Sequence, residues 1–306
     1  MGGAPLFLKT LGTTSISIPE VGIGTSDYHA GPEPLRRGLA EGAFLDTAAS
    51  YGSEPVVAEA IRGIRDRVFV ATKVSRQNLH SQALRRSVEL SLQRLRVDVI
   101  DLLQLHEPNP GVPIEETIGA MTEMVDAGKV RFIGVSNFSL AQLQEAQRAS
   151  KKYPIVSNQV RYNIIDRTIE KDLLPYCQAN RITIIAYSPL ARGLHRVQDC
   201  DSQQAVELLA KETGKTSAQI ILNWCLCKEG VVVIPRANST ARIVENCGAS
   251  DWRLSARHLA LLDDKIQYRR RSRLGTLVKP YIHFSVKEFA LRMVKYLPRA
   301  IRGRVI

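Results

Sequence analysis

The stretch A-F-L-D-T-A-A-S-Y-G-S-E, residues 43–54, decides which fold and which chemistry this chain suggests. Phe44 and Leu45 end a short apolar strand, Asp46 lies at its tip, and Tyr51 follows in a loop of small residues. Glu54 then begins a helical pattern. The apolar positions that recur at helix spacing are Val57, Ala60, Ile61 and Ile64. The stretch therefore predicts a strand, a loop and a helix in sequence.

Two more charged side chains end strand-like segments further along the chain. Lys73 closes V-F-V-A-T-K, and His106 closes I-D-L-L-Q-L-H. If these strands are parallel neighbours, their carboxyl ends meet at one edge of the sheet. Asp46, Tyr51, Lys73 and His106 are then expected to lie together.

This set of side chains suits proton transfer to a carbonyl group. A free phenol has a pKa of ~10, and a nearby ammonium is expected to lower it. A carboxylate keeps the lysine charged, and a histidine can polarise a carbonyl oxygen, so the four groups could protonate a carbonyl as its carbon accepts a hydride. Taken singly, each has a structural alternative: a loop cap, packing, a solvated strand end or a structural histidine.

Composition limits the other classes of function. The 306 residues fit one large α/β domain or two ordinary ones, and no apolar run approaches the ~20 residues of a membrane span. An odd number of cysteines, five, favours a reducing cytoplasm, and their spacing predicts no metal site. Of the +12 formal charge, residues 269–306 hold +10, from eleven Lys or Arg against one Glu. The rest of the chain is nearly neutral, so nucleic-acid binding is not predicted.

The order of segments predicts an α/β fold, a (β/α)8 barrel. Residues 6–18 alternate around Gly12 and suggest an N-terminal hairpin. Helices are expected at about 81–96, 114–127, 139–152, 169–180, 203–228 (broken near Gly214) and 255–267, with Ser139 and Ser255 as N-caps that lack a full capping box. The expected strands are Pro19–Gly24, Phe44–Asp46, Val68–Lys73, Ile100–His106, Phe132–Ser136, Ile155–Val160, Ile182–Tyr187 and Val231–Pro235. A doubly wound sheet is the alternative, but G-I-G-T-S at 22–26 lacks its G-x-G-x-x-G fingerprint.

Further polar groups follow the later strands. Ser136, Asn137 and Gln159 could hold a carboxamide, and Tyr187, followed by Ser188, could stack on a flat heterocycle. After the last strand, a helix begins between Arg236 and Arg242, an arrangement that suits a phosphate. The alternative for these two arginines is a solvated helix start.

These residues resemble the aldo-keto reductases over essentially residues 5–268. The matching motifs, in order, are D-T-A-x-x-Y-G-S-E, A-T-K, L-L-Q-L-H, G-V-S-N-F, N-Q-V-x-Y-N, A-Y-S-P-L and I-P-x-x-x-x-x-A-R-I-x-E-N. The resemblance implies a (β/α)8 barrel that uses NADPH, with NADH as a weaker alternative, and no metal. It implies a catalytic tetrad of Asp46, Tyr51, Lys73 and His106, with Tyr51 as the general acid. Substrate contacts would come from Tyr51, His106 and Glu107.

The resemblance also assigns the cofactor site. Ser136, Asn137 and Gln159 would hold the nicotinamide amide, and Tyr187 would stack on its ring. Ser188 and Leu190 would line the pyrophosphate, Arg236 and Arg242 would face the 2′-phosphate, and Glu245 and Asn246 would lie near the adenine. The remaining residues implied to line the cofactor are Gly24, Thr25, Ile234, Ala237 and Asn238.

The chain departs from the common family pattern at two places. The phosphate segment usually begins Lys-Ser, whereas here it begins Arg236-Ala237. Members that act on apolar substrates often have Trp where this chain has Ser26 and Glu107. A small polar or sugar-derived carbonyl is therefore the expected substrate. The alternatives are an NADP(H)-binding redox sensor without catalysis and a membrane-associated regulatory protein. The oligomeric state is left open.

The basic tail, residues 269–306, is predicted to contain its own helix. Ser285 and Glu288 have capping-box spacing, and an apolar stripe follows as far as Leu297, before Pro298. Three interpretations remain open: packing on the barrel, peripheral contact with an anionic membrane, or a partner contact or lid.

Overall fold

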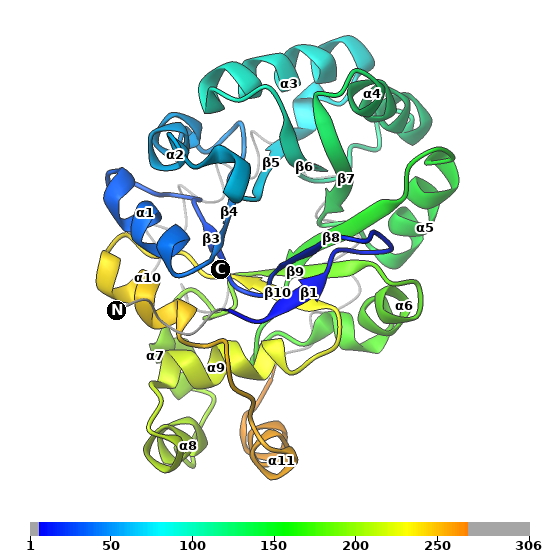
Figure 1. The fold of residues 1–306 in the computed structure, drawn as a ribbon. Helices are drawn as coiled ribbons and strands as arrows, with labels where there is room; N and C mark the ends of the chain where they lie inside the picture. Colours follow the sequence, from blue (N-terminus) through cyan, green and yellow to red (C-terminus); the bar gives the residue numbers. More distant parts are fainter. Residues whose placement is uncertain (1–5, 269–306) are drawn as a thin grey trace, which may run out of the picture. The chain divides into compact units, whose positions relative to one another are not determined.

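A computed structural model describes residues 6–268, so the helix predicted within 269–306 lies outside the described residues. Eight parallel strands form one sheet in the order β10-β9-β8-β7-β6-β5-β4-β3, with helices arranged around it (Figure 1). The strands are β3 (Gly22–Gly24), β4 (Phe44–Asp46), β5 (Val70–Val74), β6 (Ile100–Leu105), β7 (Val130–Ser136), β8 (Ile155–Arg161), β9 (Thr183–Tyr187) and β10 (Val231–Ile234). The predicted (β/α)8 barrel is confirmed.

The barrel closes where β3 approaches β10. Val21, just before β3, forms a parallel bridge with Val233. The Val233 amide donates to the Glu20 carbonyl at 2.9 Å, and the Gly24 amide donates to the Pro235 carbonyl at 3.2 Å. Glycine is needed at position 24, because a Cβ there would lie 2.9 Å from the Ile234 carbonyl oxygen.

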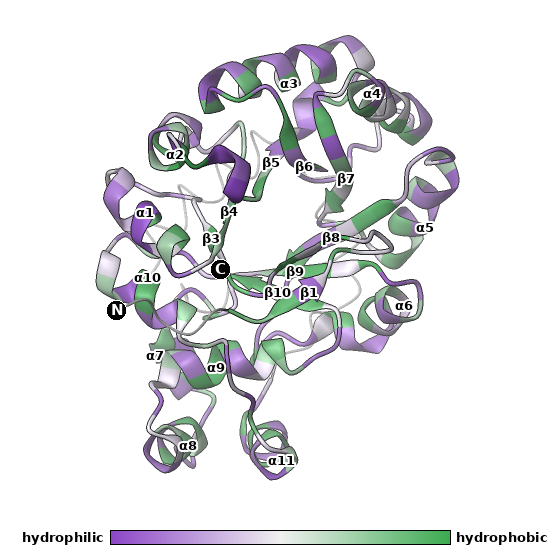
Figure 2. Cartoon of the chain, in the orientation of Figure 1, coloured by the Kyte–Doolittle hydropathy of each residue, from purple (hydrophilic) through white to green (hydrophobic). Residues whose placement is uncertain are grey.

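The helices cover the outside of the strands. Figure 2 shows hydrophobic and hydrophilic residues together on most helices, as expected when one face packs on a sheet and the other meets water. The helices are α1 (Pro32–Ala40), α2 (Glu54–Ile61), α3 (Ser81–Leu95), α4 (Ile114–Asp126), α5 (Leu140–Ala149), α6 (Leu173–Ala179), α7 (Leu194–Gln198), α8 (Ala205–Thr213), α9 (Ser217–Leu226), α10 (Thr240–Cys247) and α11 (Ala256–Lys265). Within residues 6–268, no helix is long and apolar enough to cross a membrane.

The predicted N-terminal hairpin is present and packs into one end of the barrel. Strands β1 (Leu8–Thr10) and β2 (Ser17–Pro19) pair antiparallel. Leu11 and Ile18 are buried with residues of the barrel interior, such as Phe44 and Leu102. Lys9 fixes the hairpin, because its ammonium donates to the carbonyl of Leu226, at the end of α9, at 2.6 Å.

Several predicted boundaries were wrong by part of a turn or strand. The helix from Glu54 ends at Ile61, so Ile64 lies beyond it, and the segment predicted as one helix at 169–180 is a 3-10 turn followed by α6. The first predicted strand is divided between β2 and β3. Ser139 does form a complete capping box, because Gln142 supplies the reciprocal bond that the sequence prediction left out. Gln does this as well as Glu, since the bond needs only a side-chain acceptor.

Candidate active site

Side chains at every second position of the strands point into the barrel and form successive layers, and the site lies in the layers nearest the carboxyl ends. Phe44, Ala71 and Leu102 belong to the inner hydrophobic cluster. Side chains two residues apart point to the same face of a strand. Asp46, Lys73 and Gln104 are therefore the next inward layer, and His106 follows Gln104 at the carboxyl end, where (β/α)8 barrels carry their active sites.

Asp46 and Lys73 form a buried ion pair at the centre of this layer. The Lys73 ammonium donates to Asp46 Oδ1 at 2.5 Å and to the Thr47 carbonyl at 2.8 Å. Both side chains are almost completely buried, with 0% and 2% of their surface exposed. Burial is the largest single influence and lowers the pKa of Lys73, but the charge and hydrogen bond of Asp46 together with those of Tyr51 outweigh it, so the pKa is raised. The lysine is therefore held as the cation.

The second carboxylate oxygen of Asp46, Oδ2, accepts hydrogen bonds from the side-chain amides of two residues. Only one of them, Gln159, was predicted from the sequence as a site residue, and its predicted role was to hold the nicotinamide amide. Gln159 Nε2 donates to Asp46 Oδ2 at 2.8 Å, and Gln104 Nε2 lies 3.3 Å from the same oxygen. The amide nitrogen of Gln159, predicted to face the nicotinamide, thus donates to Asp46 instead. Gln104 was missed, although its inward position two residues before His106 was a usable signal.

Tyr51 and His106 meet beside this ion pair. Tyr51 Oη lies 3.3 Å from His106 Nε2, and the two rings are 5.4 Å apart in an edge-to-face arrangement. Lys73 Nζ lies 5.0 Å from the centroid of the Tyr51 ring. The sequence analysis expected the lysine to lower the pKa of the phenol. The Lys73 charge does lower the pKa of Tyr51, as expected, but burial raises it by more, so the net pKa of the phenol is raised.

His106 is neutral at physiological pH. Burial, assisted by the charge of Lys73, lowers its pKa from 6.5 to about 4. The side-chain amide of Asn137 donates a hydrogen bond to the backbone carbonyl of His106 at 2.9 Å. A neutral imidazole can donate one hydrogen bond and accept another, so it can orient a carbonyl oxygen without adding charge. Glu107 follows directly and is half-buried.

The residues predicted to hold a nicotinamide form one hydrogen-bonded group. Tyr187 Oη donates to Asn137 Oδ1 at 2.8 Å, and the amide nitrogen of Asn137 also lies 3.1 Å from the Ser136 hydroxyl. Asn137 has a left-handed backbone (φ +62°), and its side chain bonds both the His106 carbonyl and the Tyr187 hydroxyl. Ser188 follows Tyr187, and its carbonyl accepts from Asn163 at 3.0 Å. Asn137 connects this group to the tetrad through its bond to the His106 carbonyl, and the nicotinamide role of these residues stays a prediction.

The residues predicted to bind the adenosine end form a second group, after β10. Arg236 Nη1 lies 3.2 Å from the Asp27 carbonyl and 3.6 Å from its carboxylate. Asn238 Oδ1 accepts the His29 amide at 3.2 Å. Arg242 is exposed on α10. Of the other predicted cofactor residues, Gly24, Thr25, Ile234, Ala237 and Asn246 are buried, while Leu190 and Glu245 are half-buried. The two arginines are therefore on the surface, where a phosphate can reach them.

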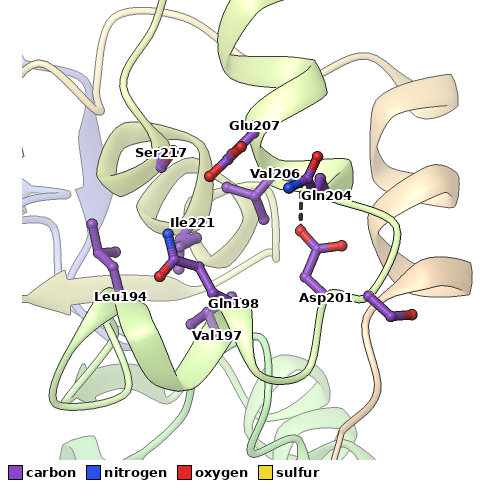
Figure 3. Close-up of a pocket in the computed structure, with 10 residues that line it drawn as sticks. Leu194, Val197, Gln198, Asp201, Gln204, Val206, Glu207, Ser217 and Ile221 are labelled. Carbon is purple, nitrogen blue, oxygen red and sulfur yellow. Dashed lines mark hydrogen bonds between the residues drawn. The ribbon is translucent and has the colours of Figure 1, made fainter.

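The pocket drawn in Figure 3 belongs to another part of the molecule. It lies among α7, α8 and α9, has a volume of about 290 Å³, and is lined by residues such as Gln198, Asp201 and Glu207. Asp201 is already engaged there, since it accepts the amides of Ala205 and Val206. No tetrad residue lines this cavity. Within residues 6–268, no group of three or more His, Cys, Asp or Glu side chains is placed to hold a metal ion.

Comparisons with known proteins agree with this geometry. The family model described as "Aldo/keto reductase family" matches residues 35–267. The methylglyoxal reductase YeaE of Escherichia coli is 36% identical over 259 residues, which cover 81% of this chain and 91% of that protein. The glyoxal reductase of Bacillus subtilis is 32% identical over 255 residues, 81% of this chain and 89% of that protein.

A solved structure gives the same result for the fold. The aldo-keto reductase from Klebsiella pneumoniae, crystallised in complex with NADPH, superimposes with a TM-score of 0.81. The two chains are 35% identical, and the match covers 87% of this chain and 98% of the other.

Proposed function

The chain belongs to the aldo/keto reductase family and is an NAD(P)H-dependent oxidoreductase, and we propose that it reduces a small polar aldehyde or ketone to the alcohol, with Tyr51 as the proton donor. The observation that carries this proposal is the meeting of Tyr51, His106 and the buried Asp46–Lys73 pair at one rim. The cofactor is NADPH, as in the related structures.

Each residue of the tetrad has a role that follows from its environment. The raised pKa of Tyr51 keeps the phenol protonated until a carbonyl oxygen becomes basic enough to take its proton. Lys73 then stabilises the phenolate that remains, and Asp46 keeps Lys73 charged. Neutral His106 hydrogen-bonds the same carbonyl oxygen and orients it. When bound, NADPH would supply the hydride for the carbonyl carbon.

The residues around the tetrad have the chemistry that this cofactor needs. Tyr187 offers a ring to the nicotinamide, and Ser136, Asn137 and the oxygen of Gln159 can bind its carboxamide. Ser188 and Leu190 are proposed to line the pyrophosphate. The adenosine end is proposed to contact Gly24, Thr25, Ile234, Arg236, Ala237, Asn238, Arg242, Glu245 and Asn246.

The substrate class rests on the mouth of the barrel. Ser26 is exposed and Glu107 is half-buried, so neither of these two positions offers an apolar wall. Related proteins are named as reductases of methylglyoxal and glyoxal, which are small polar dicarbonyls. Tyr51, His106 and Glu107 are proposed to contact such a substrate. A panel of small aldehydes with NADPH tests this proposal, and NADPH oxidation no faster than in the Tyr51→Phe variant would contradict it.

Replacing Arg242 with alanine is expected to weaken NADPH binding at least ~10-fold and NADH binding by much less. The physical reason is that a charge-assisted bond to the 2′-phosphate is lost, and NADH has no such phosphate. Titration of both cofactors by fluorescence measures this difference. If the two affinities fall by the same factor, Arg242 does not bind the 2′-phosphate.

Histidine 106 is expected to make the fold sensitive to mild acid. Its pKa is about 4 in the folded chain and 6.5 when unfolded, so the unfolded chain binds the extra proton between these values. The free energy of unfolding should fall by about 2 kcal/mol from this group alone between pH 7.5 and pH 5. Urea unfolding of the wild type and of His106→Gln at both pH values measures the difference. Equal pH dependence in the two proteins would rule this effect out.

The proposal also covers the cellular location of the protein and the role of residues 269–306. We propose a cytoplasmic protein, because all five cysteines, which fall within residues 6–268, are free thiols. For residues 269–306, treated as a separate basic extension, we propose peripheral contact with an anionic membrane surface. Co-sedimentation with anionic vesicles should occur for the full chain and be lost for a chain ending at Tyr268; equal sedimentation of both would contradict it.

A further inference from the structure

Three arginines without an assigned role gather at the mouth of the barrel. Arg161 is the last residue of β8, and it pairs in register with Tyr187, the last residue of β9. Arg192, which is exposed and has a left-handed backbone (φ +67°), lies in the turn that follows β9, and Arg196 lies on α7. None of the three belongs to the tetrad or to the proposed cofactor residues.

Arg161 lies on the same face of β8 as a residue of the catalytic layer. It is two residues beyond Gln159, whose side chain donates to Asp46, and side chains two apart share a face. Arg161 is therefore one layer nearer the mouth than the Asp46–Lys73 pair. Its guanidinium carbon lies 5.9 Å from the centroid of the Tyr187 ring. A group bound to Arg161 would thus lie close to the reacting carbonyl.

The guanidinium of Arg161 has an unused hydrogen-bond donor. Its Nε is buried and has no hydrogen-bond partner among residues 6–268. A buried donor without an acceptor is unfavourable, and such groups are rare in folded proteins. An incoming anion would satisfy this donor.

The charges around Arg161 also favour an anion. In the part of the chain that the structure describes, none of the three guanidinium groups forms an ion pair with a carboxylate at 4.0 Å or less. Burial and then the positive charges of Arg161 and Arg196 lower the pKa of Arg192. Asp27 is near enough to oppose this effect, but it also lies 3.6 Å from Arg236. Two arginines and one carboxylate, Asp27, therefore act on Arg192.

We propose that Arg161, supported by Arg192 and Arg196, binds a carboxylate or phosphate on the carbonyl substrate itself. This inference rests on the proposed carbonyl reduction and names its substrate class: an aldehyde or ketone that carries an anionic group a few bonds from the carbonyl. A guanidinium suits both anions, because its planar donors can bind two oxygens at once. The position of Arg161 on the face of β8 that carries Gln159, one layer above the Asp46–Lys73 pair, favours the substrate over the cofactor phosphates.

Matched pairs of substrates test this proposal with the full chain. In one pair, 4-carboxybenzaldehyde is compared with 4-formylbenzamide, which has nearly the same shape without the charge. In the other, glyceraldehyde 3-phosphate is compared with glyceraldehyde. We expect kcat/KM of the wild type to be at least ~10-fold higher for the anionic member of one or both pairs, mainly through KM. The pair that shows the preference identifies carboxylate or phosphate as the ligand.

Arg161→Met keeps the side-chain stem and removes the charge. It should abolish the preference, leave kcat/KM for the neutral member within ~2-fold, and leave the NADPH dissociation constant unchanged. Arg161→Lys, which keeps the charge without the planar fork, should retain part of the preference. Arg86→Met, at an exposed position of α3, is the matched control and should behave as the wild type.

Three results would overturn the proposal. They are no preference in the wild type, a preference that survives in Arg161→Met, and a loss of NADPH affinity in that variant, which would mean that the arginines hold cofactor phosphates. Failure of the proposed function is distinguishable, because neither member of either pair would then be reduced faster than by Tyr51→Phe.

Discussion

Replacing Tyr51 with phenylalanine is expected to lower kcat for carbonyl reduction by at least ~100-fold, the usual contribution of a general acid. The substitution removes only the hydroxyl, which lies 3.3 Å from His106 Nε2, and keeps the ring that packs edge-to-face on the imidazole. Affinity for NADPH should change little, because Tyr51 is not among the proposed cofactor contacts. Stopped-flow reduction with saturating NADPH and a small aldehyde measures kcat directly.

The control for this variant is Tyr176→Phe. It removes a hydroxyl that donates to Gln147 at 2.9 Å on the outside of the barrel, and it should leave kcat unchanged. Turnover by Tyr51→Phe near the wild-type level would show that another group supplies the proton. A fall in kcat together with an equal loss of NADPH affinity would indicate a disturbed pocket instead of a missing acid.

The Asp46–Lys73 pair gives the largest expected effect on stability. Asp46→Asn keeps the shape of the side chain but leaves the fully buried ammonium of Lys73 without a counter-charge. Removing one partner of a buried ion pair typically costs about 3–5 kcal/mol of unfolding free energy. Lys73 should also lose its proton more easily, because burial then lowers its pKa without opposition from Asp46. Urea denaturation at pH 7 measures the change.

A double-variant cycle separates this pairing from general damage. Asp46→Asn combined with Lys73→Met removes both charges, so the unfolding free energy should recover by at least ~2 kcal/mol relative to Asp46→Asn alone. Additive losses in the two single variants would mean that the pair contributes no coupling, and the assignment of a buried ion pair would be wrong. Asp46→Asn and the double variant should both be inactive, so the recovery in unfolding free energy is independent of catalysis.

Much of the architecture was predictable because its signals are local. Apolar runs bounded by polar residues marked every parallel strand, and parallel order alone placed Asp46, Lys73 and His106 at one rim. The engagement of Gln159 and Gln104 by Asp46 was not predictable in this way, since it depends on side-chain positions across strands far apart in the sequence. The effect of the Lys73 charge on the pKa of Tyr51 was predicted, but the larger and opposite effect of burial was not, because burial cannot be judged before the loop is folded.

Barrel closure at Val21 and Val233 has a consequence for how the chain is made. Synthesis runs from the amino terminus, so β3 emerges from the ribosome with β4 as its only later neighbour for most of translation. Its second edge stays open until β10 has been made, near the end of the barrel sequence. The tetrad residues are complete once His106 has emerged, long before that edge can close. A nascent chain can therefore contain the four proposed catalytic side chains and still expose an unpaired strand edge, which is a site for chaperone binding and for misassembly.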